Sequence, residues 1–289
     1  MTSTAADGFC MLACLGDLVE DVIVRLAGPV NVASDTHAHI ARRRGGSAAN
    51  VAAVAGALGH GARFLGQVGT DAIGTALLAE LADEGVDTSM VRRGGSTGTI
   101  VALVDHLGER TMLTDRRSCL DFDDPDRSWL DGVDVLHVPF YSLATGSIAA
   151  TAATVIAWAH ERGVAVSIDV SSTAIMAEVG LDEVSRRLEQ AAPTVVFANA
   201  AEAAALGVDG PVVGAITVVK RGPQPASIHR RDRTVVEVEA IAVPGVNDTT
   251  GAGDAFAAGF LTQPGWVDDP AAACASGHRA AAALLSRRC

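Results

Sequence analysis

Residues 133–170, VDVLHVPFYSLATGSIAATAATVIAWAHERGVAVSIDV, decide the fold of this chain. Two runs rich in β-branched residues, 133–139 and 164–170, have the composition of buried strands. The segment between them, around 146–161, is rich in alanine and long enough for a helix. Two strands joined by a helix are normally parallel neighbours. A parallel strand must start at the same end of the sheet as the strand before it, and the helix carries the chain back to that end. The stretch therefore predicts a β-α-β unit.

The same alternation continues on both sides of this unit. Further strands are predicted at 9–16, 62–69, 194–199 and 214–220, and further helices at 47–59 with Ser47 as N-cap, 71–85, 181–191 and 200–206. The pattern predicts an α/β fold with a doubly wound, mainly parallel sheet flanked by helices, in a single domain over residues 1–289. Such sheets bind ligands beyond the carboxyl ends of their strands, where Asp169 and Asn199 are expected.

Two stretches interrupt this rhythm. Residues 18–44 and 96–114 are β-rich without an intervening helix, and each reads as a pair of strands. Together they predict a small β-sheet that projects from the core as a lid. The basic run ARRR at 41–44 is interpreted as a solvated face of this lid.

Composition narrows the class of protein. The formal net charge is −12, which argues against a nucleic-acid surface, since such a surface needs a basic field. No apolar run approaches the roughly 20 residues of a membrane helix, and the N-terminus lacks the basic region of a signal peptide. The five cysteines form no CxxC pair or Cys/His cluster, which fits a reducing compartment. We expect a cytoplasmic protein that binds neither nucleic acid nor membrane.

The segment DTTGAGDAFAAGFL, residues 248–261, carries the clearest chemical signal. Its composition predicts a helix that starts just after Gly251. The free amides and positive dipole end of such a start bind anions, and Gly251 and Gly253 let a ligand approach the backbone closely. Asp254 follows in the first turn of this helix. Its charge would repel a phosphate that is only bound there, but it is well placed to take a proton from a hydroxyl that attacks the phosphate. The alternative is that Asp254 only caps the helix.

Two common nucleotide-binding patterns are missing. A Walker A loop needs lysine followed by serine or threonine, but the single lysine of the chain, Lys220, is followed by Arg221. The turn after the first strand, CLGDLVED, lacks the GxGxxG of dinucleotide-binding folds. The chain is therefore neither a P-loop protein nor a Rossmann dinucleotide binder.

DTTGAGDAF and the earlier GGSAANVA, residues 45–52, resemble the two signatures of the ribokinase-like, or PfkB-type, carbohydrate kinase family. The resemblance runs over nearly the whole chain, with both signatures in order. It implies a doubly wound α/β core with a small β-sheet lid. It also implies transfer of the γ-phosphoryl group of ATP to a hydroxyl of a sugar, nucleoside or related molecule, with Mg²⁺ and a monovalent cation such as K⁺ as cofactors.

The resemblance assigns a catalytic set around the helix start. This set consists of Asp254 as general base, the amides of Gly251, Ala252 and Gly253 as anion hole, and Asp248 with Thr250 as the loop that is similar to the family's monovalent-cation site. All of these residues lie between positions 248 and 254, so the implied chemistry is concentrated in one segment.

The acceptor side is implied by Gly16 to Asp21, which resembles the GxxxxD segment whose aspartate holds acceptor hydroxyls. With Asp21, the implied substrate ligands are Gly45, Gly46, Asn50 and Arg110 on the lid. A surface salt bridge is an equally good interpretation of Arg110.

The nucleotide side is implied by three further segments. NAAE, residues 199–202, resembles the NxxE motif that helps to order Mg²⁺ and phosphate, so Asn199 and Glu202 are implied, with Glu202 acting on Mg²⁺ indirectly. VVKRG, residues 218–222, resembles the strand-turn that meets the nucleotide, which implies Lys220 and Gly222. Gly277 and its neighbours on the last helix would flank the adenine.

The identity of the acceptor stays open between a sugar, sugar acid, phosphosugar and nucleoside. Aromatic residues make up only 4% of the chain, which favours sugars over stacked bases. A phosphosugar would need a positive pocket, which arginines at 42–44, 92–93 and 116–117 would provide if they converged. A non-catalytic sugar-binding homologue is the other functional alternative. Valine and isoleucine in 22–32 and 99–104 fit a homodimer that pairs through the lid.

Overall fold

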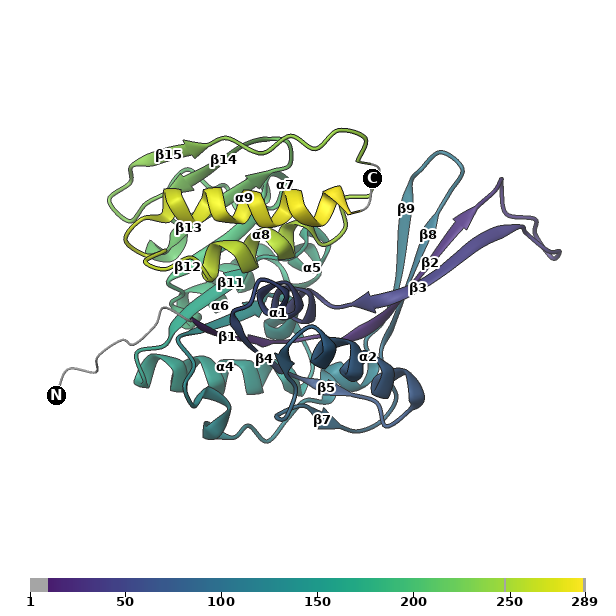
Figure 1. The fold of residues 1–289 in the computed structure, drawn as a ribbon, viewed down its shortest axis with the longest axis horizontal. Helices are drawn as coiled ribbons and strands as arrows, with labels where there is room; N and C mark the ends of the chain where they lie inside the picture. Colours follow the sequence, from purple (N-terminus) through teal and green to yellow (C-terminus); the bar gives the residue numbers. More distant parts are fainter. Residues whose placement is uncertain (1–9, 247, 288–289) are drawn as a thin grey trace.

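The computed structural model describes residues 10–246 and 248–287, and a nine-stranded sheet forms the centre of this part of the molecule (Figure 1). Its strands are β1 (Met11–Leu15), β4 (Gly61–Leu65), β6 (Val86–Asp87), β10 (Val135–Pro139), β11 (Ala165–Asp169), β12 (Val195–Asn199), β13 (Ile216–Arg221), β14 (Gln224–His229) and β15 (Val235–Val238). The spatial order is β15-β14-β13-β12-β11-β10-β1-β4-β6. Strands β14 and β15 are antiparallel additions at one edge, and all other pairs are parallel.

Helices cover both faces of this large sheet. One face carries α1 (Ser47–Ala57), α2 (Ala72–Asp83), α8 (Ala252–Leu261) and α9 (Pro270–Ser286), and the other carries α3 (Tyr141–Ala144), α4 (Ser147–Glu161), α5 (Thr173–Val179), α6 (Leu181–Ala191) and α7 (Ala200–Ala205). Short 3-10 turns lie at Arg117–Asp121, Arg127–Leu130 and Val212–Gly214. Leu12 and Cys14 of β1 point into one core and Ala13 and Leu15 into the other, so the doubly wound α/β prediction is confirmed. Over the residues described, none of the helices is long and apolar enough to cross a membrane.

The β10–α4–β11 unit follows from its sequence. Every residue of β10 is buried, as expected for a strand covered on both faces. Helix α4 starts after Gly146, and its buried residues Ile148, Ala152, Val155 and Ala159 recur every three or four positions. This spacing forms one apolar stripe that packs on β10 and β11. The two strands are therefore held as parallel neighbours by the helix between them.

A separate four-stranded sheet projects from the side of the core (Figure 1). This small sheet consists of β2 (Val19–Leu26), β3 (Ala38–Gly45), β8 (Thr99–Val104) and β9 (Arg110–Asp115) in the order β3-β2-β8-β9. The central strands β2 and β8 are parallel, and the hairpin partners β3 and β9 form the two edges. A two-stranded sheet of β5 (Gln67–Val68) and β7 (Arg92–Arg93) lies beside the core. The helix-free stretches of the sequence thus form a small sheet, as predicted.

Two local predictions were wrong. The strand expected at 62–69 is divided: β4 joins the large sheet, whereas β5 pairs with β7. Ser47 is the first residue of α1 and not its N-cap, which is Gly46. Gly46 has a φ of 100°, and a Cβ on it would lie 2.1 Å from the carbonyl oxygen of Asp17, so only glycine fits this entry to the helix. Residue 9 of the first expected strand lies outside the described residues.

Candidate active site

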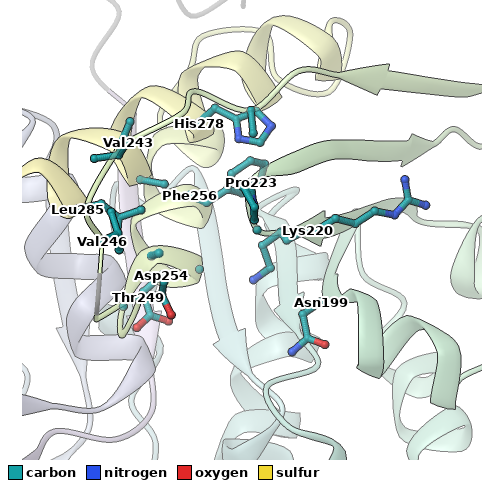
Figure 2. A pocket seen from close by; sticks show the side chains of 18 of the residues that line it. Asn199, Lys220, Pro223, Val243, Val246, Thr249, Asp254, Phe256, His278 and Leu285 are labelled. Atoms are coloured by element: carbon teal, nitrogen blue, oxygen red, sulfur yellow. The ribbon is translucent and has the colours of Figure 1, made fainter. Parts of the chain in front are cut away.

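A cleft of about 740 Å³ opens at the carboxyl ends of β11, β12 and β13, beside the start of α8 (Figure 2). Its walls include Asp169, Asn199 and Lys220 from the strand ends and His278 from α9. Figure 2 shows the Lys220 side chain pointing into the space between Asp254 and Asn199. The volume is that of a typical small-molecule site, at the edge where parallel α/β sheets bind their ligands.

Helix α8 begins at the wall of this cleft. Its N-cap, Gly251, has a φ of 77°, a left-handed conformation that glycine adopts without strain. The Ala252 amide donates to the carbonyl of Thr249 at 3.1 Å, so it is already bonded within the turn. Of the predicted anion hole, the amides of Gly251 and Gly253 are therefore the better donors to a ligand. First-turn amides and the helix dipole favour an anion here.

Asp254 lies in the first turn of α8 and is held by two side chains of α1. Ser47 Oγ donates to its Oδ1 at 2.7 Å, and Asn50 Nδ2 donates to its Oδ2 at 2.9 Å. Burial raises the pKa of Asp254, and the two hydrogen bonds oppose part of that rise. Both carboxylate oxygens are directed to α1, which argues against the alternative in which Asp254 only caps α8.

Lys220 reaches the same cleft from β13. Its Nζ lies 2.6 Å from Asp169 Oδ2 and 3.2 Å from the position that a Cβ on Gly253 would take. Burial works to lower the pKa of Lys220, but the charge and hydrogen bond of Asp169, with Glu202 and Asp254 adding to them, raise it instead. The ammonium therefore stays charged next to the helix start and adds to its attraction for an anion.

Asn199 and Glu202 form a capping box at the start of α7. The Glu202 amide donates to Asn199 Oδ1 at 2.9 Å, and the Glu202 carboxylate accepts from the Asn199 amide at 2.8 Å and from Nδ2 at 2.6 Å. Burial, followed by the charge of Asp169, raises the pKa of Glu202. In the described part of the chain, no group of three His, Cys, Asp or Glu side chains is arranged to hold a metal ion. Asp169 and Glu202 both line the cleft, but Asp169 is paired with Lys220 and Glu202 is bonded to Asn199. These carboxylates therefore fit a Mg²⁺ that keeps its waters and arrives with nucleotide phosphates.

The predicted acceptor residues gather where β2, β3 and α1 meet. A Cβ on Gly45 would lie 2.2 Å from Asp21 Oδ1, so the small residue makes room for this carboxylate. Burial raises the pKa of Asp21, the charge of Arg43 opposes this rise, and the charge of Asp254 adds to it. Asn50 is bonded to Asp254, and Gly46 starts the helix that carries Asn50. The fold thus places Asp21, Gly45, Gly46 and Asn50 near Asp254, but of these five residues Asp254 alone lines the cleft.

Two arginines of the small sheet converge on the loop before α8. Arg110 donates to Thr250 Oγ1 at 3.1 Å and to Asp248 Oδ1 at 3.2 Å, and Arg43 donates to Asp248 Oδ2 at 3.2 Å. Arg110 therefore does form a salt bridge, but with a loop that leads into the helix start. Arg43 belongs to the run predicted to be a solvated face, and that prediction was wrong for it.

The other arginines considered for a positive pocket do not converge. Their ion pairs are Arg42 with Glu20, Arg44 with Glu80 and Glu84, Arg92 with Asp123 and Asp124, and Arg117 with Asp115. The Arg44 side chain is only 10% exposed, so it too departs from the solvated-face prediction. Each of these charges is neutralised locally, whereas Arg93 donates to the carbonyl oxygen of Gly69 and to Thr75 Oγ1. None of these arginines lines the cleft.

Sequence reasoning named Arg116 for a positive pocket but missed its two partners, Asp17 and Tyr141. Arg116 forms an ion pair with the buried Asp17, and its guanidinium lies 3.9 Å from the ring centroid of Tyr141, which lines the cleft. Burial raises the pKa of Asp17, and the charge of Arg116 opposes this effect. Their positions in the sequence could have identified them, because Asp17 follows the carboxyl end of β1 and Tyr141 follows that of β10, and ligands bind at these strand ends.

The nucleotide-side glycines have different positions. Gly222 lines the cleft at the turn between β13 and β14. Gly277 instead packs against α8, where a Cβ on it would lie 2.8 Å from the carbonyl oxygen of Phe256. Its neighbour His278 does line the cleft, with its ring 5.0 Å from that of Phe256 in an edge-on arrangement (Figure 2).

A helix start, a half-buried carboxylate and an ammonium around one cleft form a site suited to moving a phosphoryl group to a hydroxyl. Such a site on a doubly wound sheet with a small projecting sheet defines a class of small-molecule kinases. A family model described as "pfkB family carbohydrate kinase" matches residues 11–288. The chain belongs to this family and is a carbohydrate kinase, a phosphotransferase with an alcohol group as acceptor.

Named relatives agree with this assignment. An ATP-dependent ribose-1-phosphate kinase of Halopiger xanaduensis is 34% identical over 239 residues, which are 78% of this chain and 74% of that protein. Fructosamine kinase FrlD of Bacillus subtilis is 31% identical over 233 residues, 75% of each chain. The solved structure of adenosine kinase from Sinorhizobium meliloti matches with a TM-score of 0.82 and 22% identity over 96% of this chain and 94% of that one. At that identity, the likeness concerns the fold.

Proposed function

We propose that this protein is an ATP-dependent kinase that transfers the γ-phosphoryl group to a hydroxyl of a sugar or sugar-like molecule, with Asp254 as the general base. The observation that carries the proposal is the position of Asp254, which is half-buried beside the start of α8, faces the cleft and lies close to Lys220. Its raised pKa supports this role, because a base becomes more effective as its pKa approaches the working pH.

In the proposed reaction, the acceptor hydroxyl gives its proton to the Asp254 carboxylate. The hydroxyl oxygen forms a bond to the γ-phosphorus while the bond from that phosphorus to the β–γ bridging oxygen breaks, and ADP leaves with the electron pair. Ser47 and Asn50 orient the carboxylate. The first-turn amides and Lys220 balance the charge on the phosphoryl oxygens.

ATP would lie along the cleft between the β13–β14 turn, at Gly222, and α9, at His278. An ATP complex of the uncharacterized sugar kinase PH1459 from Pyrococcus horikoshii shares the fold, with a TM-score of 0.79, and supports this choice of nucleotide. A bound Mg²⁺ would neutralise charge on the phosphates, and Asp169 and Glu202 would hold it through water. Because ATP is available inside cells, the proposed reaction belongs in the cytoplasm.

The proposed acceptor is a sugar or sugar derivative held by the Asp21 carboxylate and by the second amide hydrogen of Asn50. Asn50 uses its first amide hydrogen on Asp254, and its oxygen accepts from Arg44. The names of the two relatives, which refer to ribose 1-phosphate and fructosamine, support this class. A nucleoside is the alternative acceptor, but one face of Tyr141 is covered by Arg116 and is not available to stack a base. A phosphorylated sugar would need an arginine to bind its phosphate, and an arginine such as Arg43 or Arg110 would first have to leave its carboxylate partner.

We further propose that the small sheet acts as a lid and as a dimer interface. Val22, Val24, Ile40, Val101 and Leu113 share the face opposite to Asp21 and Arg43, by the two-residue period of their strands. Ile40 is 59% exposed on that face, which is unfavourable for a large apolar side chain in an isolated molecule. Pairing with a second copy would cover it.

The central test is ATP consumption with a panel of sugars, sugar phosphates and nucleosides, using wild type and Asp254→Asn. We expect the variant to lose activity about 10²–10⁴-fold, the usual contribution of general-base catalysis. Asp268→Asn is the matched control, because Asp268 is exposed in the connection between α8 and α9 and does not line the cleft.

Each alternative has its own outcome. An Asp254→Asn variant near the wild-type rate would rule out the assigned base. Turnover of nucleosides alone would establish the nucleoside alternative. A sugar that raises the melting temperature but is never phosphorylated would establish a non-catalytic binder.

A further inference from the structure

The loop before α8 is organised by a single carboxylate. Asp248 Oδ1 accepts from the Thr250 amide at 3.0 Å and from Thr250 Oγ1 at 2.6 Å, which fixes the turn that leads to Gly251. The side chain of Asp248 is only 17% exposed. Whatever balances its charge therefore also determines where the first amides of α8 lie.

Two guanidinium groups already balance that charge. Arg110 bonds to Oδ1, Arg43 bonds to Oδ2, and Arg110 also bonds to Thr250 Oγ1. Partial burial works to raise the pKa of Asp248, but hydrogen bonds from Thr250 and the charge of Arg43 outweigh it and hold the pKa well below the usual range. Both oxygens of the carboxylate thus have a cationic partner.

A monovalent cation does not fit this arrangement. The resemblance found in the sequence implies K⁺ at Asp248 and Thr250, and K⁺ needs oxygen ligands that are free to face it. Here the side-chain oxygens of both residues are bonded to arginine, and a third positive charge would meet two others in a half-buried, poorly screened place. The donor set therefore disagrees with the implied ion.

We propose that Arg43 and Arg110 replace the monovalent cation, so that the enzyme works without K⁺ and its helix start is positioned by the small sheet. This inference rests on the proposed kinase function. Arg43 lies on β3 and Arg110 on β9, the two opposite edges of the small sheet, so both edges hold the same loop. The arginines are positioning residues: they act on the phosphoryl group through the loop and the amides that follow it.

The experiment compares initial rates in potassium chloride and tetramethylammonium chloride at equal ionic strength. Wild type is expected to give the same rate in both salts. In the double variant Arg43→Met/Arg110→Met, the freed carboxylate becomes able to bind K⁺, and we expect a loss of about tenfold or more without K⁺, since small misplacements of reacting groups cost up to about 10²-fold. Potassium should then stimulate this variant by about fivefold or more, the lower range of a typical coupling between sites.

Arg42→Met is the matched control. Arg42 is on the same strand as Arg43 but faces the other way, is 63% exposed and pairs with Glu20, so its rate should equal that of wild type in both salts. The proposal is overturned if K⁺ stimulates wild type fivefold or more. It is also overturned if the double variant is as fast as Arg42→Met, or slow and indifferent to K⁺, because the arginines would then not substitute for an ion.

Thermal melting gives a second readout that does not need an acceptor. Potassium, compared with tetramethylammonium, should leave the melting temperature of wild type unchanged and raise that of the double variant, because a ligand of the native state stabilises it. If no acceptor is phosphorylated, the proposed function fails while melting still decides the cation question. If the double variant does not fold, Arg110→Met alone serves in both measurements.

Discussion

The large sheet and the small sheet hold their parts of the active site by different forces. In the large sheet, Phe197 is fully buried and packs edge-on against Phe260 at 5.2 Å, within a core shared with α8 and α9. In the small sheet, the buried apolar cluster consists of Ile23, Ala102 and Val104. Its contacts to the loop before α8 are ion pairs of half-exposed arginines.

This difference separates a rigid half from a movable half. Close-packed apolar contacts resist displacement, whereas ion pairs near the surface exchange readily with water and ions. Regions with few buried apolar contacts open at low free-energy cost, and lids are drawn from such regions. We infer that Lys220 and the body of α8 are fixed by the core. The acceptor side opens and closes with the small sheet, which also holds the loop before α8 through Arg43 and Arg110.

The largest expected effect tests whether the core of the large sheet contributes more to stability than the core of the small sheet. Ile168→Ala in β11 and Ile23→Ala in β2 delete the same atoms, from the large and the small sheet respectively. Ile168 is fully buried in the main core, so its truncation should cost about 4 kcal/mol of unfolding free energy, in the upper part of the usual range. Ile23 packs in a buried cluster of three residues, so its truncation should cost about 2 kcal/mol of unfolding free energy. Urea denaturation measures both, and equal losses would contradict the division into two halves.

Lys220→Met should have the next largest effect, because it acts on the rigid, phosphoryl side. The ammonium is expected to stabilise charge on the phosphoryl group, so its loss should lower kcat about 10²-fold, as for other preorganised donors. The charge of Lys220 also lowers the pKa of Asp254, which burial raises. Without it that pKa rises further, so the acid limb of the kcat/KM profile should move to higher pH.

Lys220→Arg is the control for this prediction, since it keeps the charge. Its acid limb should stay near that of wild type even if its rate falls. An unchanged acid limb in Lys220→Met would mean that Asp254 is not the group that titrates in the reaction.

Much of the rigid half was predictable from sequence, because its signals are local. The strand at 133–139 and the helix around 146–161 carry their own periodicity, and α8 was predicted with its observed bounds, 252–261. The glycines of DTTGAGDAF identify an anion-binding helix start without knowledge of the remaining fold. The small sheet was predictable as an element, from two helix-free β-rich stretches.

The partners across the site were not predictable, because they are far apart in sequence. Ser47 was assigned to a cap by a local rule, yet its hydroxyl bonds to Asp254, 207 positions away. Arg43 was assigned to solvent because it lies in a basic run, yet it pairs with Asp248 after 205 positions. One sequence contains no signal for such pairs; they follow from how the small sheet lies against the core.

A smaller effect concerns the stability that the protein loses by keeping Asp254 ionised. Because the pKa of Asp254 is raised in the folded state, the native protein binds its proton more tightly than the unfolded chain does, so keeping the carboxylate ionised at neutral pH costs stability. Asp254→Asn should therefore raise the unfolding free energy by about 1 kcal/mol at pH 7 while it lowers activity about 10²–10⁴-fold. The gain should shrink as the pH falls toward 3.8, the ordinary value for aspartate. Destabilisation by this variant at pH 7 would favour a structural cap over a catalytic base.

The smallest expected effect on stability tests the outer face of the small sheet. Ile40→Asp places a charge on an exposed position, so the unfolding free energy of the single chain should change by no more than about 0.5 kcal/mol. The proposed dimer should nevertheless dissociate, because a buried unpaired charge is costly at an interface. Met112→Asp is the control, since Met112 is 52% exposed on the opposite face of the same sheet. Light scattering at micromolar concentration should give a dimer mass for wild type and Met112→Asp and a monomer mass for Ile40→Asp. A monomeric wild type would remove the interface from the proposal and leave the small sheet with the role of a lid alone.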